Sequence, residues 1–183
     1  MIQDKRGCKI VVVAHCILNQ NSRVFGIAYY PGMINEIVDV LRKHEVGVIQ
    51  MPCPELTYAG LLRWSCTKEQ YDTPAFRRHC RQIASSAVDQ VEEYLRNGFN
   101  VLAILGVDGS PTCGVDETSV GYKGGYLPKL APTREAKIIK APGVFVEELQ
   151  YELKERKVVV PIKGVRHTRA SQDAAWLEKI LTK

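Results

Sequence analysis

Four runs of apolar, largely β-branched residues constrain the fold of this chain more than any other feature. They cover residues 9–16, 45–53, 100–107 and 157–162. Each run is nearly continuous in apolar residues instead of alternating with polar ones. This is the pattern of strands that are buried on both faces, as in a parallel sheet covered by helices.

Helical patterns separate these runs. The longest opens with Thr73 as a candidate N-cap and Pro74 in the first turn, and it stops before Gly98. The predicted helices cover residues 33–44, 74–97, 145–155 and 170–182. Alternation of strands and helices predicts a Rossmann-like α/β fold, with a mainly parallel sheet of four or more strands and helices on both faces.

Length and composition fit an ordinary globular protein. The chain has 183 residues, of which 45% are hydrophobic and 25% charged, so we expect a single domain over residues 1–183. Its net charge of +5 favours a scattered basic surface over a nucleic-acid-binding face. We expect no membrane partner and a cytoplasmic location, because we find neither a membrane-spanning run nor a signal-peptide pattern.

The segment 115–142 departs from this regular pattern. It is long for a connection and rich in Gly, Lys and Pro. Such loops are usually functional, so we predict a long loop or lid over these residues.

Three of the six cysteines are predicted to meet. Cys16, Cys53 and Cys113 each come at or just after the end of a predicted strand. Ligand sites in parallel α/β sheets lie beyond the carboxyl ends of the strands, so the three thiols should share one edge. Plain burial of cysteines at strand ends is an equally open interpretation. Three thiolates suit either a zinc ion with an open position or a 4Fe–4S cluster with one free iron.

The remaining cysteines serve as internal controls. Cys8 lies at the far end of the first strand, roughly 25 Å from Cys16 at about 3.3 Å per residue. Cys80 falls on the apolar stripe of the longest helix and is expected in the core. Cys66 follows the second strand and is a reserve ligand. The chain has no CxxC pair, which argues against thioredoxin-type and zinc-ribbon sites.

Three short motifs resemble a known family. They are "AHCILNQNSR" at 14–23, "CPE" at 53–55 with "GLLR" at 60–63, and "GSPTCG" at 109–114. In this order and spacing they resemble the signatures of the TudS-like thiouracil desulfidases.

The resemblance implies a 4Fe–4S enzyme whose cluster is held by Cys16, Cys53 and Cys113, with the fourth iron open to a substrate sulfur. It implies a non-redox, hydrolase-type reaction that removes sulfur from a thiolated pyrimidine. Asn19 stands where the family tends to have Gly, and Thr112 replaces a Ser. We therefore expect a TudS-related branch that acts on a small thiolated molecule of its own.

Two residues are candidates for the chemistry. Glu55 lies two residues beyond Cys53 and could act as the base that delivers water to the thiocarbonyl carbon. Its alternative role is that of an N-cap or salt-bridge carboxylate in a turn. Ser110 could hydrogen-bond the substrate or a cluster sulfide, or it could simply form the turn with Pro111.

Three further residues are candidates for substrate binding. Asn19 and Arg23 follow Cys16 and could orient a ring or a carboxylate, and Thr112 lies beside Cys113. Basic side chains after the fourth strand could bind a phosphate or form a solvated face: Arg166, His167 and Arg169.

Two other functions use the same thiols. The first is a zinc-dependent hydrolase or deaminase, although the chain lacks the H-x-E and P-C-x-x-C patterns of nucleobase deaminases. The second is a non-enzymatic iron–sulfur-binding or redox-sensing module. The colour of the purified protein would separate zinc from a cluster.

Overall fold

The computed structural model describes residues 4–122 and 136–182. In chain order its elements are β1 (Lys9–Ala14), α1 (His15–Leu18), the 3-10 turn η1 (Gln20–Ser22), α2 (Asn35–Lys43), β2 (Gly47–Met51), α3 (Pro54–Ala59), α4 (Lys68–Tyr71), α5 (Pro74–Arg96), β3 (Asn100–Val107), β4 (Thr118–Val120), β5 (Lys137–Ile139), α6 (Val144–Glu155), β6 (Ile162–Val165), the 3-10 turn η2 (His167–Arg169) and α7 (Ala170–Leu181).

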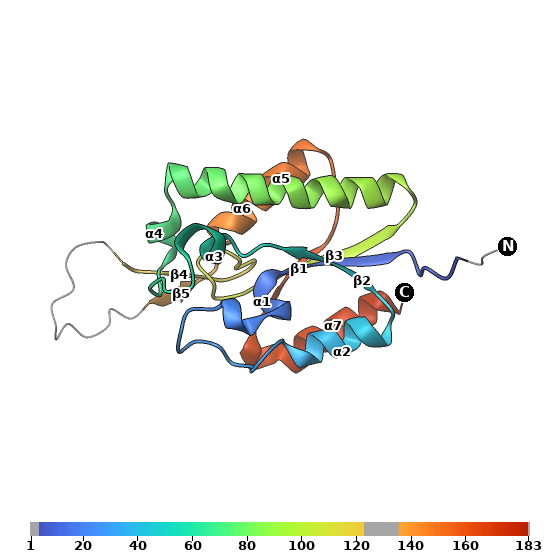
Figure 1. The fold of residues 1–183 in the computed structure, drawn as a ribbon, viewed down its shortest axis with the longest axis horizontal. Coiled ribbons are helices and arrows are strands. Elements are labelled where there is room, and N and C mark those ends of the chain that lie inside the picture. Colours follow the sequence, from blue (N-terminus) through green and yellow to red (C-terminus); the bar gives the residue numbers. More distant parts are fainter. Residues whose placement is uncertain (1–3, 123–135, 183) are drawn as a thin grey trace.

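The main sheet has the strand order β2-β1-β3-β6, and all its pairings are parallel. Helices α5 and α6 cover one face, and α2 and α7 cover the other (Figure 1). The central strand β1 is therefore enclosed on both sides, and Val11, Val12 and Val13 are fully buried. This arrangement confirms the predicted α/β fold and explains why the strand sequences are apolar without alternation.

Helix α5 begins as the sequence predicts. The Thr73 hydroxyl accepts the N–H of Phe76 at 3.2 Å, and Pro74 opens the first turn, where it has no N–H that needs a partner. Gly98 follows the helix with a φ of 78°, a conformation that suits glycine. Cys80 lies on the buried side of this helix and has no exposed surface.

The fourth predicted strand is wrong in position. The apolar run 157–162 is mostly a connection, and the strand β6 begins only at Ile162. Lys157 has a φ of 57° and turns the chain out of α6, and Val159 is 93% exposed. Pro161 has no N–H to donate to a ladder, although its carbonyl accepts the N–H of Ile104 at 2.8 Å.

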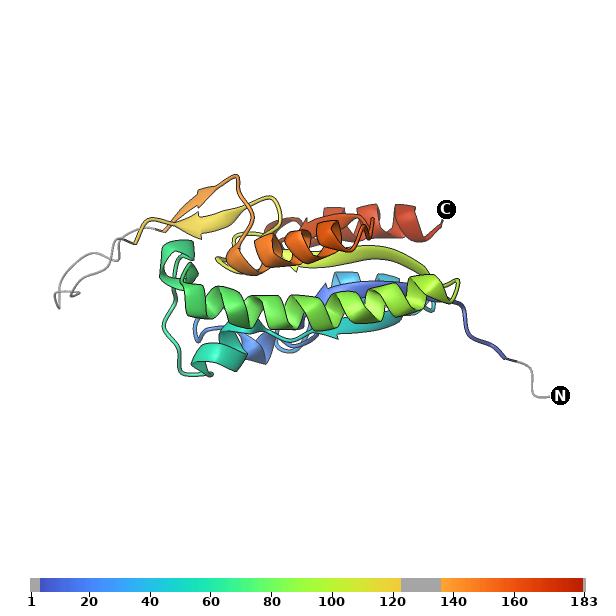
Figure 2. The ribbon, with the colours of Figure 1, turned by 90° about the horizontal axis from the view of Figure 1, so that it is seen from above.

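The segment 115–142 contains two short strands. β4 and β5 pair antiparallel and extend beyond the carboxyl ends of the main strands (Figure 2). Residues 123–135, which belong to the predicted lid, lie outside the described residues, and the lid stays a prediction. None of the helices that the structure describes is long and apolar enough to cross a membrane.

Candidate functional site

Cys16 lies just beyond the end of β1. The strand stops at Ala14, two residues earlier than predicted, and the chain turns at once into the helix α1. The side chains of His15 and Cys16 therefore follow helical geometry and do not point to opposite faces of a strand. The His15 ring forms a hydrogen bond with the Gln50 side chain of β2. Burial lowers the pKa of His15, which favours a neutral ring beside the thiol.

Cys53 is the N-cap of α3. Its Sγ accepts the N–H of Leu56 at 3.4 Å, and Pro54 occupies the first helical position. A proline is well placed there, because that position has no N–H partner within the helix. The start of α3 thus fixes the thiol beyond the end of β2, two residues after the strand stops at Met51.

Cys113 lies in a tight loop after β3. Its carbonyl accepts the N–H of Val107 at 2.7 Å, which folds the loop back onto the strand. A Cβ on Gly106 would lie 2.5 Å from that carbonyl, and a Cβ on Gly143 would lie 2.4 Å from the carbonyl of Thr112. Both glycines are therefore required for the close approach of the loop to β3 and to the start of α6.

The three thiols influence one another. Burial raises the pKa of Cys16 to about 12, and Cys53 and Glu55 add to this rise while Arg23 opposes it. Burial is the largest cause that raises the pKa of Cys113 well above its usual range, and the nearby thiols of Cys53 and Cys16 raise it further. The structure thus brings the predicted cysteines together, because β2, β1 and β3 are neighbours in the sheet. Their role as ligands stays a prediction.

The donor set consists of thiols, the donors that both zinc sites and 4Fe–4S clusters use. All six cysteines are free thiols. Within the described ranges, no three Cys, His, Asp or Glu side chains are arranged to hold a metal ion. A single zinc requires its sulfurs to converge at about 2.3 Å from one point. In a 4Fe–4S cluster each cysteine binds its own iron, so the thiols surround a larger group.

The other cysteines lie where the sequence predicts. Cys8 precedes β1 at the amino end of the sheet, where its carbonyl accepts the N–H of Asn100. Cys80 is buried in α5 among core side chains. Cys66 lies between α3 and α4, and burial raises its pKa while Tyr71 lowers it through a hydrogen bond.

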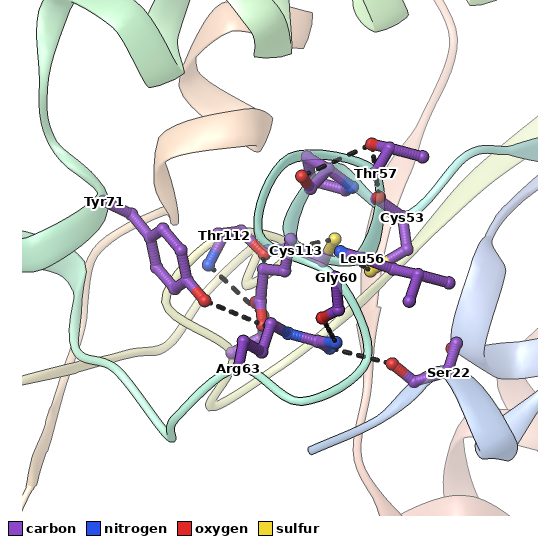
Figure 3. Close-up of polar contacts among 12 residues, drawn as sticks. Ser22, Cys53, Leu56, Thr57, Gly60, Arg63, Tyr71, Thr112 and Cys113 are labelled. Atoms are coloured by element: carbon purple, nitrogen blue, oxygen red, sulfur yellow. Dashed lines mark hydrogen bonds and ion pairs between the residues drawn. The ribbon is translucent and has the colours of Figure 1, made fainter.

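Glu55 is held by three side chains. It is buried in the first turn of α3, and its Oε2 accepts from Arg63 at 3.2 Å and from the Tyr71 hydroxyl at 3.4 Å. Its Oε1 accepts from the Thr112 hydroxyl at 2.7 Å. Figure 3 shows Arg63, Tyr71 and Thr112 converging next to Cys53 and Cys113. The geometry thus contains the salt bridge that we considered as an alternative for this residue, placed beside two of the three thiols.

Ser110 and Thr112 extend this network. Their hydroxyl oxygens are 3.2 Å apart, so a chain of hydroxyls runs from Ser110 through Thr112 to Glu55. The Ser110 oxygen also accepts the N–H groups of Thr112 and Cys113, at 3.2 Å and 3.0 Å. Ser110 therefore forms the turn as well as the end of the hydroxyl chain.

Asn19 and Arg23 differ in how they are used. The Asn19 Oδ1 accepts the N–H of Asn21 at 3.1 Å and thereby caps η1. The Arg23 guanidinium lies 5.3 Å from the centre of the Tyr29 ring. No carboxylate in the described part of the chain forms an ion pair with Arg23. The Tyr29 ring also stacks on His167.

The arginines after β6 are occupied. Arg166 pairs with Glu117, and Arg169 bonds Asp173 through its Nε at 3.3 Å. These acids occupy the guanidinium groups that would otherwise be available to a phosphate. Of the three arginines predicted near this edge, Arg23 is the one without an acid partner among the described residues.

Sequence reasoning assigned no role to Arg63 or Tyr71. Arg63 lies in the "GLLR" motif, so its proximity to the motif of Cys53 was the available signal. The side chain of Arg63 also donates to the carbonyl of Ser22 at 2.8 Å and joins the segments that follow β1 and β2. Tyr71 lies in α4, 16 residues after Glu55, and only the fold brings the two together.

Comparisons with known proteins give one relative and one similar structure. No known family model matches the chain. The uncharacterized protein MJ0003 of Methanocaldococcus jannaschii is 31% identical over 178 residues, which is 97% of each chain. The solved structure of a [4Fe–4S]-dependent thiouracil desulfidase, TudS, has a TM-score of 0.54 and 18% identity. The match covers 93% of this chain and 99% of TudS, and it shows that the two share a fold.

Proposed function

We propose that this chain, which belongs to the same family as the Methanocaldococcus jannaschii protein MJ0003, is a desulfidase that depends on a 4Fe–4S cluster and removes sulfur from a small thiolated molecule. The reaction is hydrolytic: R₂C=S and water give R₂C=O and hydrogen sulfide, with no net transfer of electrons. On this proposal the chain forms a branch related to TudS, which is a thiouracil desulfidase.

The grouping of Cys16, Cys53 and Cys113 carries this proposal. They come from three neighbouring strand ends, and each of the elements that hold them is fixed by local hydrogen bonds. Their raised pKa values mean that the free thiols hold their protons at neutral pH. Binding of a metal group would release these protons and compensate the buried thiolates.

A bound cluster with one open iron would supply a Lewis acid that polarises the C=S bond. The chain itself would handle the proton. A water that donates to the Thr112 oxygen can pass its proton on while the Thr112 hydroxyl proton moves to Glu55, with Ser110 hydrogen-bonded to the same Thr112 oxygen. We assign Glu55 as the final acceptor, with Arg63 and Tyr71 holding its other oxygen.

Substrate orientation is assigned to Arg23, with smaller parts for Asn19 and for Thr112, whose hydroxyl is already donated to Glu55. The charge of Arg23 acts on the Cys16 thiol, so this guanidinium lies within electrostatic range of the site. The Oδ1 of Asn19 is already used to cap η1. The segment 115–142 follows Cys113 directly, and we propose that it covers the substrate.

The test begins with protein purified without oxygen. We expect about four irons and four sulfides per chain and broad absorption near ~400 nm. Incubation with 2-thiouracil as the probe, without reductant, should release sulfide and place oxygen from labelled water on the former thiocarbonyl carbon. Colourless, zinc-loaded protein would favour the zinc hydrolase or deaminase. A complete cluster with no turnover would favour the binding module, and turnover that needs an electron donor would exclude the non-redox reaction.

A further inference from the structure

The Cys113 loop is closed at its base by a buried acid. Asp108 follows β3, and its side chain has no exposed surface. Its Oδ1 accepts three consecutive backbone N–H groups, from Val115 and Asp116 at 2.9 Å and from Glu117 at 3.3 Å. Residues 109–114 therefore form a loop whose two ends are joined by one carboxylate.

The second oxygen of Asp108 faces a different part of the chain. Its Oδ2 forms an ion pair with Arg169 of η2. Arg169 is held in turn by Asp173 at 3.3 Å and by the carbonyl of Gly164 at 3.3 Å. Gly164 is also needed for space, because a Cβ there would lie 2.1 Å from the Asp108 carboxylate. The acid is thus enclosed by β6 and the start of α7.

We infer that Asp108 and Arg169 are positioning residues that hold the loop of Cys113 so that its thiol faces Cys16 and Cys53. The consequence for cluster binding rests on the proposed function, whereas the positioning of the thiol does not. In the described part of the chain, neither residue forms a hydrogen bond or an ion pair with any of the three thiols. Their effect passes through the backbone of residues 115–117 and through the closure of the loop.

The loop gains little contact area from its own side chains, because most of them are small. It contains Gly109, with a φ of 83°, and Gly114, together with the small or rigid residues Ser110 and Pro111. Two other sides are held by backbone bonds to Val107 and to the first turn of α6. The carboxylate holds the third side, where the chain leaves the loop toward β4, together with the bond from the Gly109 N–H to the carbonyl of Glu117 at 2.9 Å and the bond from the Thr118 hydroxyl to the carbonyl of Ser110 at 3.0 Å. Hydrogen bonds to a charged, buried acceptor are among the stronger ones in proteins.

The test uses thiol alkylation in cluster-free protein. We compare Asp108→Asn, Arg169→Gln and Arg169→Lys with wild type, and we measure the iodoacetamide reaction of each cysteine by peptide mass spectrometry. Arg156→Gln is the matched control: Arg156 pairs with acids of α5 and α6, and its side chain is 22% exposed against 26% for Arg169. Cys80 reports global opening, because it is buried in α5.

We expect Cys113 to react roughly tenfold faster or more in Asp108→Asn and Arg169→Gln, with Cys80 unchanged, because loss of a charged clamp favours local opening. Arg169→Lys should give an intermediate rate, and Arg156→Gln should leave Cys113 as in wild type. An unchanged Cys113 rate in folded variants, or a rise shared equally by Cys80, overturns the inference.

Cluster content separates this inference from the proposed function. If wild type holds a cluster, Asp108→Asn and Arg169→Gln should bind iron more weakly, whereas equal binding together with unchanged alkylation defeats the positioning role alone. If wild type holds no cluster, the proposed function fails, and the alkylation result still decides whether Asp108 positions Cys113.

Discussion

Cys16 and Cys80 have similarly raised pKa values, but they lie in different parts of the fold. Burial raises the pKa of both thiols to about 12. Cys80 lies on α5 and packs into the hydrophobic core. Cys16 lies beyond the end of β1, at the edge of the sheet where Cys53 and Cys113 also follow their strands. Burial therefore says little about what a cysteine does, and its place in the fold says more.

The fold explains the difference. A helix such as α5 presents a single stripe to the sheet, so its cysteine meets apolar side chains from the strands. The carboxyl ends of neighbouring parallel strands instead bring together residues from separate parts of the sequence. Polar groups collect there because the loops between strands and helices carry them.

Removal of single thiols gives the largest expected effect. Cys16→Ala, Cys53→Ala and Cys113→Ala should each lose the cluster, whereas Cys80→Ala should keep it and lose about 1 kcal/mol of stability through a small cavity. Iron and sulfide content of protein purified without oxygen measures the first effect, and urea unfolding measures the second. Full cluster content in a folded Cys113→Ala protein would contradict the distinction between the predicted ligands and the core cysteine Cys80.

Removal of a charge near the thiols should come next. Glu55→Gln should lower turnover by roughly 10²–10⁴-fold with the cluster retained, as expected for loss of a general base. Glu148→Gln is the matched control, because Glu148 is also buried and pairs with Arg77 and Arg81. It should reduce stability without this loss of turnover. Equal turnover in the two variants would contradict the role of Glu55.

The hydroxyl chain should give a smaller effect. Thr112→Val removes the donor to Glu55, and we expect a loss of turnover of roughly tenfold, because hydrogen bonds to charged groups contribute about 1.5–3 kcal/mol. Thr112→Ser keeps the hydroxyl and should retain most of the turnover. Steady-state rates of both variants, normalised to cluster content, provide the measurement. A valine variant as fast as the serine variant would rule out a proton path through this residue.

Titration of Cys80 should give the smallest effect. Its pKa is raised in the folded state, so its contribution to stability is complete below about pH 8.5, the usual thiol value, and is lost as pH rises toward 12. Between pH 8 and pH 10, cluster-free wild type should lose about 1–2 kcal/mol more than Cys80→Ala. Urea unfolding at the two pH values measures this difference. Parallel losses in both proteins would show that Cys80 does not titrate in this range.

The sequence determined the layers of this protein and the order of its main elements. Continuous apolar runs such as 9–14 and 100–107 are buried on both faces only when helices cover both sides of the sheet. This pattern lies within a few consecutive residues, so the sequence alone reveals it. The start of α5 was readable for the same reason, because Thr73 and Pro74 act within one turn. The run 157–162 was misleading, because an apolar, β-branched composition does not reveal where Pro161 and the pairing with β3 place the strand.

Only the tertiary structure decided which groups touch. The strand order β2-β1-β3 brought Cys16, Cys53 and Cys113 to one edge, and sequence alone could predict that edge but not the contacts within it. The bonds of Glu55 to Tyr71 and Thr112 span 16 and 57 residues, and that of Asp108 to Arg169 spans 61. Such contacts leave no periodic trace, because they depend on how separate loops are placed by the packed sheet and helices.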